Sequence, residues 1–416
     1  MSFRYYSFGI GKIYNPGKCA RGDDGKISWH ANKPFYMTSE YFCYRDGSPH
    51  PLKMLFCPVE PKAQPPGALM DVNVKNTAVN FLNKWNATRN PVFLAVGFHK
   101  PHVNFVFPKR FLRLHPLEDV AVTKHPNVSD STPPIAYNPS YQLRGFTDTM
   151  TFDIPGPLTP FPLDLQRLIR QHYYAAVSHI DDLVGQVLQA LVDSGKAGET
   201  VVGLIGDHGW AMGANGLYAK FGNSEAATRV PWILHDPDRH PDLSGFRYVN
   251  PMTSSKERSY PHDTVPEPVE LLDLFPTLVD LAGLTSLSKC READQTLCTE
   301  GQSRAKVSKK PRRGQVASAV SQYPRPALTP MRNSDMPKME FIKYMGYTIR
   351  TMRHRYTKWV EYDAELFQPN FDRVVAEELY DHEVDSEETD NLIGRASLAH
   401  VRDGLRTLLH QRLTHI

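Results

Sequence analysis

An aspartate and a histidine follow directly after an apolar stretch in the middle of the chain. Residues 201–205 carry no polar side chain, and only Gly206 separates them from Asp207 and His208. Lys220 follows a short distance further on. A carboxylate and an imidazole are common metal ligands, and an ammonium group suits an anionic oxygen. The pattern therefore predicts a polar site, although a strand-to-loop turn in which Asp207 caps the next segment would explain the same residues.

Two other places offer groups that fit the same chemistry. His99 follows the apolar run 91–97 within the string 97–102, which reads Gly-Phe-His-Lys-Pro-His, and Lys12 follows Gly11 near the start. Lys12, His99 and Lys220 could together surround one tetrahedral anion. For each residue taken singly, a solvated lysine or a loop histidine is the simpler explanation.

The surrounding pattern predicts the elements that would bring these groups together. Residues 201–205 are typical of a strand buried on both faces of a parallel sheet, and a helix-spaced apolar pattern over 165–191 precedes them. Helix followed by buried strand is the alternation of α/β proteins, in which the carboxyl ends of parallel strands share one edge. We also expect strands at 91–97 and 230–235, helices at 78–85 and 269–281, and a proline-rich surface excursion over 108–162.

A second, smaller unit is expected at the C-terminal end. The basic, proline-containing stretch 306–313 is typical of a junction, which predicts domains at 1–312 and 313–416. The predicted fold is α/β, a doubly wound, mostly parallel sheet flanked by helices, with a smaller C-terminal α+β subdomain. Its antiparallel sheet and closing helix are predicted at 316–323, 347–352, 355–362 and 398–413.

Composition limits the classes of function. The chain has 416 residues, 41% of them hydrophobic, which is ample for a large core. The formal charge of +3 does not demand a nucleic-acid partner. We expect no membrane span, because no apolar run reaches spanning length, and no signal peptide is visible in residues 1–9.

The five cysteines allow two interpretations. Cys43 and Cys57 flank one short loop, and Cys290 and Cys298 flank another, which favours two local disulfides with Cys19 left over. Free thiols are equally consistent with a cytosolic protein. Asn86 and Asn127 each begin a glycosylation sequon, a triplet that also arises by chance.

Several strings in order along the chain resemble the sulfatase family of the alkaline-phosphatase-like superfamily. The resemblance runs from about the first residue to the last. Many ordered matches are far more specific than a lone Asp-His-Gly. The strings that carry it are 93–102, 178–182, 207–213 with Ala219-Lys220, 321–326, 346–351 and 378–380.

The resemblance implies a calcium-dependent, lysosomal sulfatase that acts on 2-O-sulfated iduronate at the ends of dermatan sulfate and heparan sulfate. In that family a cysteine in a C-x-P-S-R motif becomes formylglycine, whose hydrate attacks sulfur. The resemblance makes Asp207 and His208 metal ligands, and Lys220 and His99 sulfate contacts. It makes Lys12 the lysine that steadies the nucleophile. His99 is the best-placed group to protonate or stabilise the departing sugar oxygen.

The departures from the family pattern bear on activity. No cysteine of this chain stands in a C-x-P-S-R context, so the chain as given lacks the nucleophile, and we expect it to be inactive alone. The family's opening strand, whose two aspartates complete the calcium shell, would lie upstream of Met1. Asn15 and Asn215 stand where the family carries histidines. We therefore expect an incomplete calcium site.

Three functions remain open. The first is a sulfatase whose given form lacks the nucleophile segment. The second is a sulfatase-like protein that binds sulfated glycans without turnover. The third is a phosphate-ester hydrolase on the same scaffold, which needs a serine or threonine nucleophile that the sequence does not indicate. Trp210 either faces a sugar or, as a tryptophan more commonly does, lies in the core. The sequence does not predict the oligomeric state.

Overall fold

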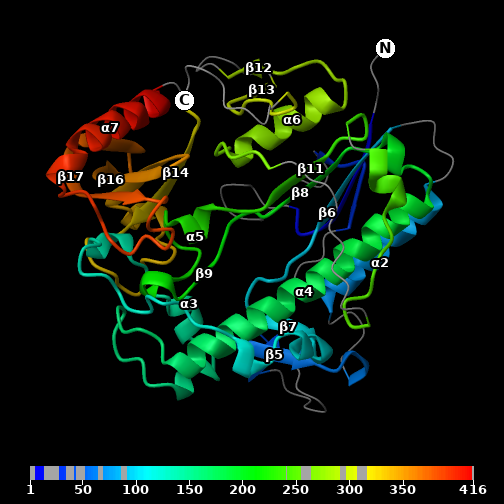
Figure 1. The fold of residues 1–416 in the computed structure, drawn as a ribbon, viewed down its shortest axis with the longest axis horizontal. Helices are drawn as coiled ribbons and strands as arrows, with labels where there is room; N and C mark the ends of the chain where they lie inside the picture. Colours follow the sequence, from blue (N-terminus) through cyan, green and yellow to red (C-terminus); the bar gives the residue numbers. More distant parts are fainter. Residues whose placement is uncertain are drawn as a thin grey trace.

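The fold has an N-terminal unit, which contains one long helix, and a C-terminal unit built on an antiparallel sheet (Figure 1). Helix α2 (Met70–Lys84) and the N-terminal strands lie at one side, and helix α7 (Ala399–Thr414) with the C-terminal sheet lies at the other. Helix α4 (Leu163–Asp193) confirms the predicted long helix. The computed structural model describes residues 5–13, 28–33, 42–43, 52–63, 69–85, 91–239, 241–253, 264–290, 297–306 and 316–414.

A three-stranded parallel sheet in the order β2-β1-β6 forms the N-terminal side of the scaffold. Its strands are β1 (Tyr6–Gly11), β2 (Ala31–Lys33) and β6 (Val92–Gly97), and β6 confirms the strand predicted at 91–97. Helix α2 packs on β1 and β6 and in turn against α4, and it starts earlier than the helix predicted at 78–85. Strand β1 was not predicted, because its aromatic residues show no clear alternation.

The strand that precedes Asp207 differs from the prediction. Strand β8 (Val202–Ile205) pairs antiparallel with β11 (Trp232–His235), and within the described residues it has no other strand partner. Its predicted burial on both faces is wrong, since Ile205 is 39% exposed and Ile233 on β11 is 61% exposed. A strand with a single partner is incompletely covered by its neighbours. Helix α6 (Leu274–Leu281) packs its leucines close to β8, near the predicted helix at 269–281.

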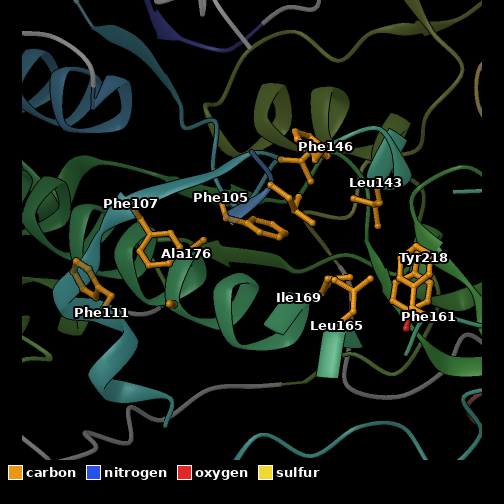
Figure 2. Close-up of a cluster of buried hydrophobic side chains, with 13 residues drawn as sticks. Phe105, Phe107, Phe111, Leu143, Phe146, Phe161, Leu165, Ile169, Ala176 and Tyr218 are labelled. Atoms are coloured by element: carbon orange, nitrogen blue, oxygen red, sulfur yellow. The ribbon is translucent and has the colours of Figure 1, made fainter. Parts of the chain in front are cut away.

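The largest apolar core lies between α4 and the segment that follows β6 (Figure 2). Strand β7 (Phe105–Pro108) pairs parallel with β5 (Phe56–Val59) and turns its phenylalanines toward α4. The predicted excursion at 108–162 contains only 3-10 turns and the short helix α3 (Tyr141–Arg144) after β7 ends. Fully buried members of this core are Leu55, Phe105, Phe107, Phe111, Leu143, Phe146, Leu165 and Ile169.

The C-terminal unit is a four-stranded antiparallel sheet in the order β14-β15-β16-β17, and α7 packs against β15 and β16. Strands β14 (Ser318–Arg325), β15 (Tyr344–Thr351) and β16 (His354–Asp363) confirm the three predicted strands. Strand β17 (Gln368–Asp381) was missed, because its charged outer half hides the alternation. The predicted junction at 312/313 lies outside the described residues.

Both predicted disulfides are present. Cys43 bonds to Cys57 beside the hairpin of β3 (Phe42–Cys43) and β4 (Leu52–Lys53), and Cys290 bonds to Cys298 beside the pair β12 (Ser288–Lys289) and β13 (Cys298–Thr299). Sequon residue Asn127 is exposed. The remaining short elements are β9 (Ala211–Met212), β10 (Tyr218–Ala219) and α5 (Glu225–Thr228). Asn15, Cys19, Asn86 and the basic residues 309–313 lie outside the described residues.

Candidate functional site

A close glycine contact places Lys12 at the carboxyl end of β6. Gly11 and Gly97 are partners in the β1–β6 register, and Gly11 has a φ of +77°. The Lys12 N–H donates to the Gly97 carbonyl at 2.8 Å. A Cβ on Gly97 would stand 2.1 Å from the Lys12 carbonyl oxygen, so no larger residue fits there without movement of the backbone. The two glycines thus bring the Lys12 backbone across the end of the strand that leads to His99.

A buried carboxylate holds the loop that carries His99. Asp71, near the start of α2, accepts hydrogen bonds from the backbone N–H groups of His99 at 2.6 Å and Lys100 at 3.1 Å. Burial raises the pKa of Asp71 despite the opposing charge of Lys100. The Lys100 ammonium donates to the carbonyls of His102 and Asn104, at 2.8 and 2.6 Å. Asp71 therefore sets the backbone of the histidine loop, a role that the sequence pattern did not indicate.

His102 lies beside His99. The two ring centroids are 4.7 Å apart. His99 is only 8% exposed, and its Nε2 is buried with no protein partner among the described residues. The sequence reasoning did not assign His102 to the site, although its place three residues after His99 in the same loop was the available signal.

The loop after β8 is fixed by a second close glycine contact. The Gly209 N–H donates to the Ala227 carbonyl at 2.8 Å, and a Cβ on Gly209 would stand 2.2 Å from the Ala226 carbonyl oxygen. The loop therefore packs tightly on α5. The His208 Nδ1–H donates a hydrogen bond to the Gly209 carbonyl at 2.8 Å. The Nε2 of the same ring lies 3.6 Å from the Asp207 carboxylate. The Asp207 side chain is 76% exposed.

The cations predicted from separate parts of the sequence act on the same histidines. Burial lowers the pKa of His99 to about 2, with further lowering from the positive charges of Lys100, His102, Lys12 and Lys220. Burial and the charge of Lys220, followed by other cations that include Lys12, lower the pKa of His102 to about 3. The pKa of His208 is also lowered, by burial first, and both Lys12 and Lys220 contribute.

The positive charges around the three histidines indicate which kind of ligand the site can bind. The positive charges of Lys12 and Lys220 both act on the imidazoles of His99, His102 and His208. Without a ligand the three imidazoles are neutral hydrogen-bonding groups. The positive charges of the lysines favour an anion, whose binding would offset the repulsion between the cations.

A complete calcium shell is not formed by the described residues. Calcium takes six to eight oxygen ligands, and Asp207 offers one carboxylate. Within the described part of the chain, Asp207 and His208 do not belong to any group of three converging His, Cys, Asp or Glu ligands. The resemblance seen in the sequence implies a calcium site, but the donor atoms described here do not fit calcium by themselves.

A different group of potential ligands is an ion-pair network. Ligand atoms of Glu225, His382 and Glu388 lie within 4.8 Å of one another. Arg355 already binds Glu388, with its Nη2 2.9 Å from Oε2, and the Arg350 Nε lies 2.8 Å from Oε2 of Glu225. Two guanidinium groups on these carboxylates leave little negative charge for a cation. We therefore assign this cluster to the packing of the C-terminal unit and not to a metal.

Asn215 has a structural role in the loop before Lys220. It is 2% exposed and has a φ of +51°, a conformation that asparagine tolerates better than most residues. Its side-chain oxygen accepts from the Ser129 N–H and the Tyr137 hydroxyl, each at 2.9 Å. Its side-chain nitrogen donates to the Glu388 carbonyl at 2.9 Å.

Trp210 lies against the core. Its ring stacks on Tyr173 with centroids 5.2 Å apart and meets the edge of Phe105 at 5.8 Å. The ring is partly buried, as expected for the core role.

Comparison with known proteins agrees with the resemblance seen in the sequence. The chain is 38% identical over 399 residues to iduronate 2-sulfatase of Homo sapiens, an alignment that covers 90% of this chain and 72% of the relative. It is 39% identical to iduronate 2-sulfatase of Mus musculus over the same shares. A sulfatase of Formosa agariphila is 31% identical over 222 residues, which cover 51% of this chain and 37% of the relative.

Solved structures share the fold at low sequence identity. A phosphonate monoester hydrolase of Agrobacterium radiobacter matches with a TM-score of 0.65 and 20% identity, covering 99% of this chain and 78% of that chain. A 2-O GAG sulfatase matches with a TM-score of 0.56 and 19% identity, covering 99% and 72%. These matches confirm the predicted alkaline-phosphatase-like fold. The family profile described as Sulfatase matches residues 23–284. The chain therefore belongs to the sulfatase family, whose members are sulfuric ester hydrolases.

Proposed function

We propose that this chain binds the sulfate ester of a glycosaminoglycan and takes part in its hydrolysis, with 2-O-sulfated iduronate of heparan sulfate and dermatan sulfate as the preferred group. The close relatives named iduronate 2-sulfatase support the choice of substrate. The observation that carries the proposal is that two lysines from distant parts of the chain act on the same buried histidines where β1, β6 and β8 end. Lys12 and Lys220 depress the pKa of His99 and His102 there, and a sulfate group would offset both charges.

The residues have distinct roles in this proposal. Lys220 and His99 contact sulfate oxygens, and Lys12 steadies the nucleophile. His99 is neutral in the ligand-free site because burial, followed by nearby positive charges that include three lysines, lowers its pKa to about 2. Bound sulfate would raise that pKa. His99 would then be able to donate a hydrogen bond, or a proton, to the departing sugar oxygen.

The nucleophile must come from outside the described residues. Cys43, Cys57, Cys290 and Cys298 are all consumed in disulfides, and Cys19 is followed by Ala-Arg-Gly and not by x-P-S-R. We therefore propose that the 416-residue chain alone binds the sulfate ester without turnover. Hydrolysis would require a formylglycine residue.

Calcium and localisation are part of the same proposal. We propose that Asp207 and His208 supply a part of a calcium shell whose other oxygen ligands are not among the described residues. A bound calcium ion would supply positive charge for sulfate oxygens. We also propose a lysosomal location, which the two disulfides support because they form in oxidising compartments. No helix in the described parts of the chain is long and apolar enough to span a membrane.

Binding and turnover measured together test the proposal. The purified chain should bind a disaccharide that ends in 2-O-sulfated iduronate in isothermal titration, and Lys220→Ala should weaken that binding at least tenfold. The same chain should release no 4-methylumbelliferone from its iduronate 2-sulfate conjugate. Lys289→Ala, which removes a lysine that caps the carbonyls of Glu300 and Gly301, is the control for lost charge.

Each alternative predicts a different outcome. A protein that binds the sulfate ester but does not hydrolyse it, even in forms that contain formylglycine, would be a non-catalytic glycan-binding protein. Cleavage of a phosphate ester would favour the phosphate-ester hydrolase. Turnover of the sulfate ester by the 416-residue chain, abolished by Lys220→Ala, would contradict the proposed absence of a nucleophile. Absence of any sulfate binding would contradict the proposal as a whole.

A further inference from the structure

The loop that carries Lys220 is attached to the C-terminal unit just after the lysine. Lys220 stands between Ala219 and Phe221, which are 1% and 2% exposed. Ala219 has a φ of +63°, a left-handed conformation that an alanine keeps only when its surroundings hold it. The Lys220 carbonyl accepts the Gly222 N–H at 3.1 Å, so the chain turns tightly at this point. Something outside the loop must stabilise this backbone.

Arg325, the last residue of β14, contacts the loop directly. Its Nη2 donates to the Phe221 carbonyl at 2.8 Å, one residue after Lys220. Its Nε donates to the Ile135 carbonyl at 3.0 Å, and its Nη1 lies 3.3 Å from the Ser334 carbonyl. One guanidinium group therefore ties three separate segments together through their main-chain oxygens.

The environment of Arg325 argues for a geometric role. The residue is 1% exposed, and its hydrogen bonds to described residues all go to carbonyl oxygens, while the charges of Asp335 and Glu378 act on it from further away. Its guanidinium lies over the rings of Tyr323 and Trp359, at 4.8 and 5.6 Å. A buried guanidinium whose hydrogen bonds all go to carbonyl oxygens is an unfavourable way to fill a core, and an apolar side chain would serve packing alone better. The planar array of donors does offer fixed directions to several carbonyls.

Two other contacts attach the same loop. The Asn223 side-chain nitrogen donates to the Gly346 carbonyl of β15 at 2.9 Å. The Glu225 N–H donates to the Glu388 carboxylate at 3.0 Å. The C-terminal unit thus holds the loop at three points after Lys220.

We propose that Arg325 is a positioning residue for Lys220, and that the C-terminal sheet acts through it to hold the ammonium group in the anion site. Arg325 itself does not touch the ligand. The proposal rests on the proposed function for the role of Lys220, but the attachment of the loop can be tested separately.

Arg144 provides a matched control. It also donates to several carbonyls, those of Pro139 at 2.8 Å, Ile154 at 3.2 Å and Thr159 at 3.1 Å. None of these belongs to the Lys220 loop. Arg325→Lys and Arg144→Lys therefore remove the same planar group from two places.

Hydrogen exchange measures the attachment without any ligand. Arg325→Lys should speed amide exchange at least tenfold in a peptide covering 215–225 and leave the peptide covering 399–414 unchanged. Arg144→Lys should leave 215–225 unchanged. Should Arg325→Lys fail to fold, Asn223→Ala tests the same attachment from β15. Unchanged exchange over 215–225 in a folded variant would overturn the proposal.

Sulfate affinity measures the consequence for the site. In titrations with inorganic sulfate at a temperature where all variants are folded, Arg325→Lys should weaken binding at least fivefold, and Arg144→Lys should not change it. Wild-type affinity in Arg325→Lys would overturn the positioning role, even with faster exchange. If the unmodified protein itself fails to bind sulfate, the proposed function fails, and the exchange experiment still decides the attachment.

Discussion

Charged side chains have different surroundings in the two units of the molecule. Where β1, β6 and β8 end, Lys12 and Lys220 act on histidines whose pKa values they lower. In the C-terminal unit, Arg355 is buried with two carboxylate partners, Glu388 and Glu378, and its pKa is raised. A site where several positive charges act on neutral imidazoles is suited to an external anion, whereas a network of paired charges contributes to the folded state itself.

Breaking the matched network should have the largest effect. Arg355→Met leaves the Glu388 carboxylate buried without its main partner, which costs about 3–5 kcal/mol of unfolding free energy. Urea unfolding followed by fluorescence measures this loss. Arg395→Ala, which breaks an exposed pair with Asp390, should cost less than about 1 kcal/mol. Similar losses of unfolding free energy in the two variants would show that the buried ion pair contributes no more to stability than the exposed one.

Placing the family's histidine at position 215 should destabilise the protein. Asn215→His puts a bulkier ring at a buried, left-handed position and removes hydrogen bonds to the Ser129 N–H and the Glu388 carbonyl. The expected cost is about 2 kcal/mol, measured as a shift in the urea midpoint. Sulfate affinity should not increase. Tighter sulfate binding in a stable Asn215→His variant would instead identify Asn215 as a lost ligand.

Acid should weaken the ligand-free protein. The folded-state pKa of His99, about 2, lies below its ordinary value of 6.5, and His102 behaves in the same way. The unfolded state therefore binds more protons below pH 6.5, and stability falls as pH drops from there, by at most about 1.4 kcal/mol per pH unit for each histidine.

Sulfate should reverse part of this loss, because a bound anion raises both pKa values. The free energy of unfolding, measured at pH 7.5 and at pH 5.0 with and without sulfate, shows how much stability sulfate restores. His99→Gln should reduce the dependence on pH, and the exposed His400→Gln should not. A dependence on pH that is the same in His99→Gln would assign it to other groups.

Removing the charge of Lys12 should have the smallest effect on stability. Lys12→Gln keeps the backbone hydrogen bond to Gly97 and relieves repulsion, so the free energy of unfolding should change by less than about 0.5 kcal/mol. Sulfate affinity should nevertheless fall. A loss of stability close to that of Arg355→Met would mean that Lys12 has a structural partner, which would remove the contrast between the two regions.

Local patterns in the sequence identified much of the scaffold. Helix α4, strand β6, the C-terminal strands β14–β16 and both disulfides follow from periodicity or short spacing. Strand β17 was missed because its outer half is charged, and the burial of β8 was wrong because the number of its neighbours depends on the whole fold. Asp71 and Arg325 could not be found from local patterns. Their roles come from main-chain contacts with residues 28 and 104 positions away.

The sequence by itself determined which chemical groups stand beyond each strand and the family to which the chain belongs, because both depend on residue types in order. Only the tertiary structure decided that Lys12 and Lys220 act on the same histidines, and that Asn215 serves the backbone. Electrostatic coupling and burial depend on distances in space, which residues far apart in the chain acquire only when the chain folds.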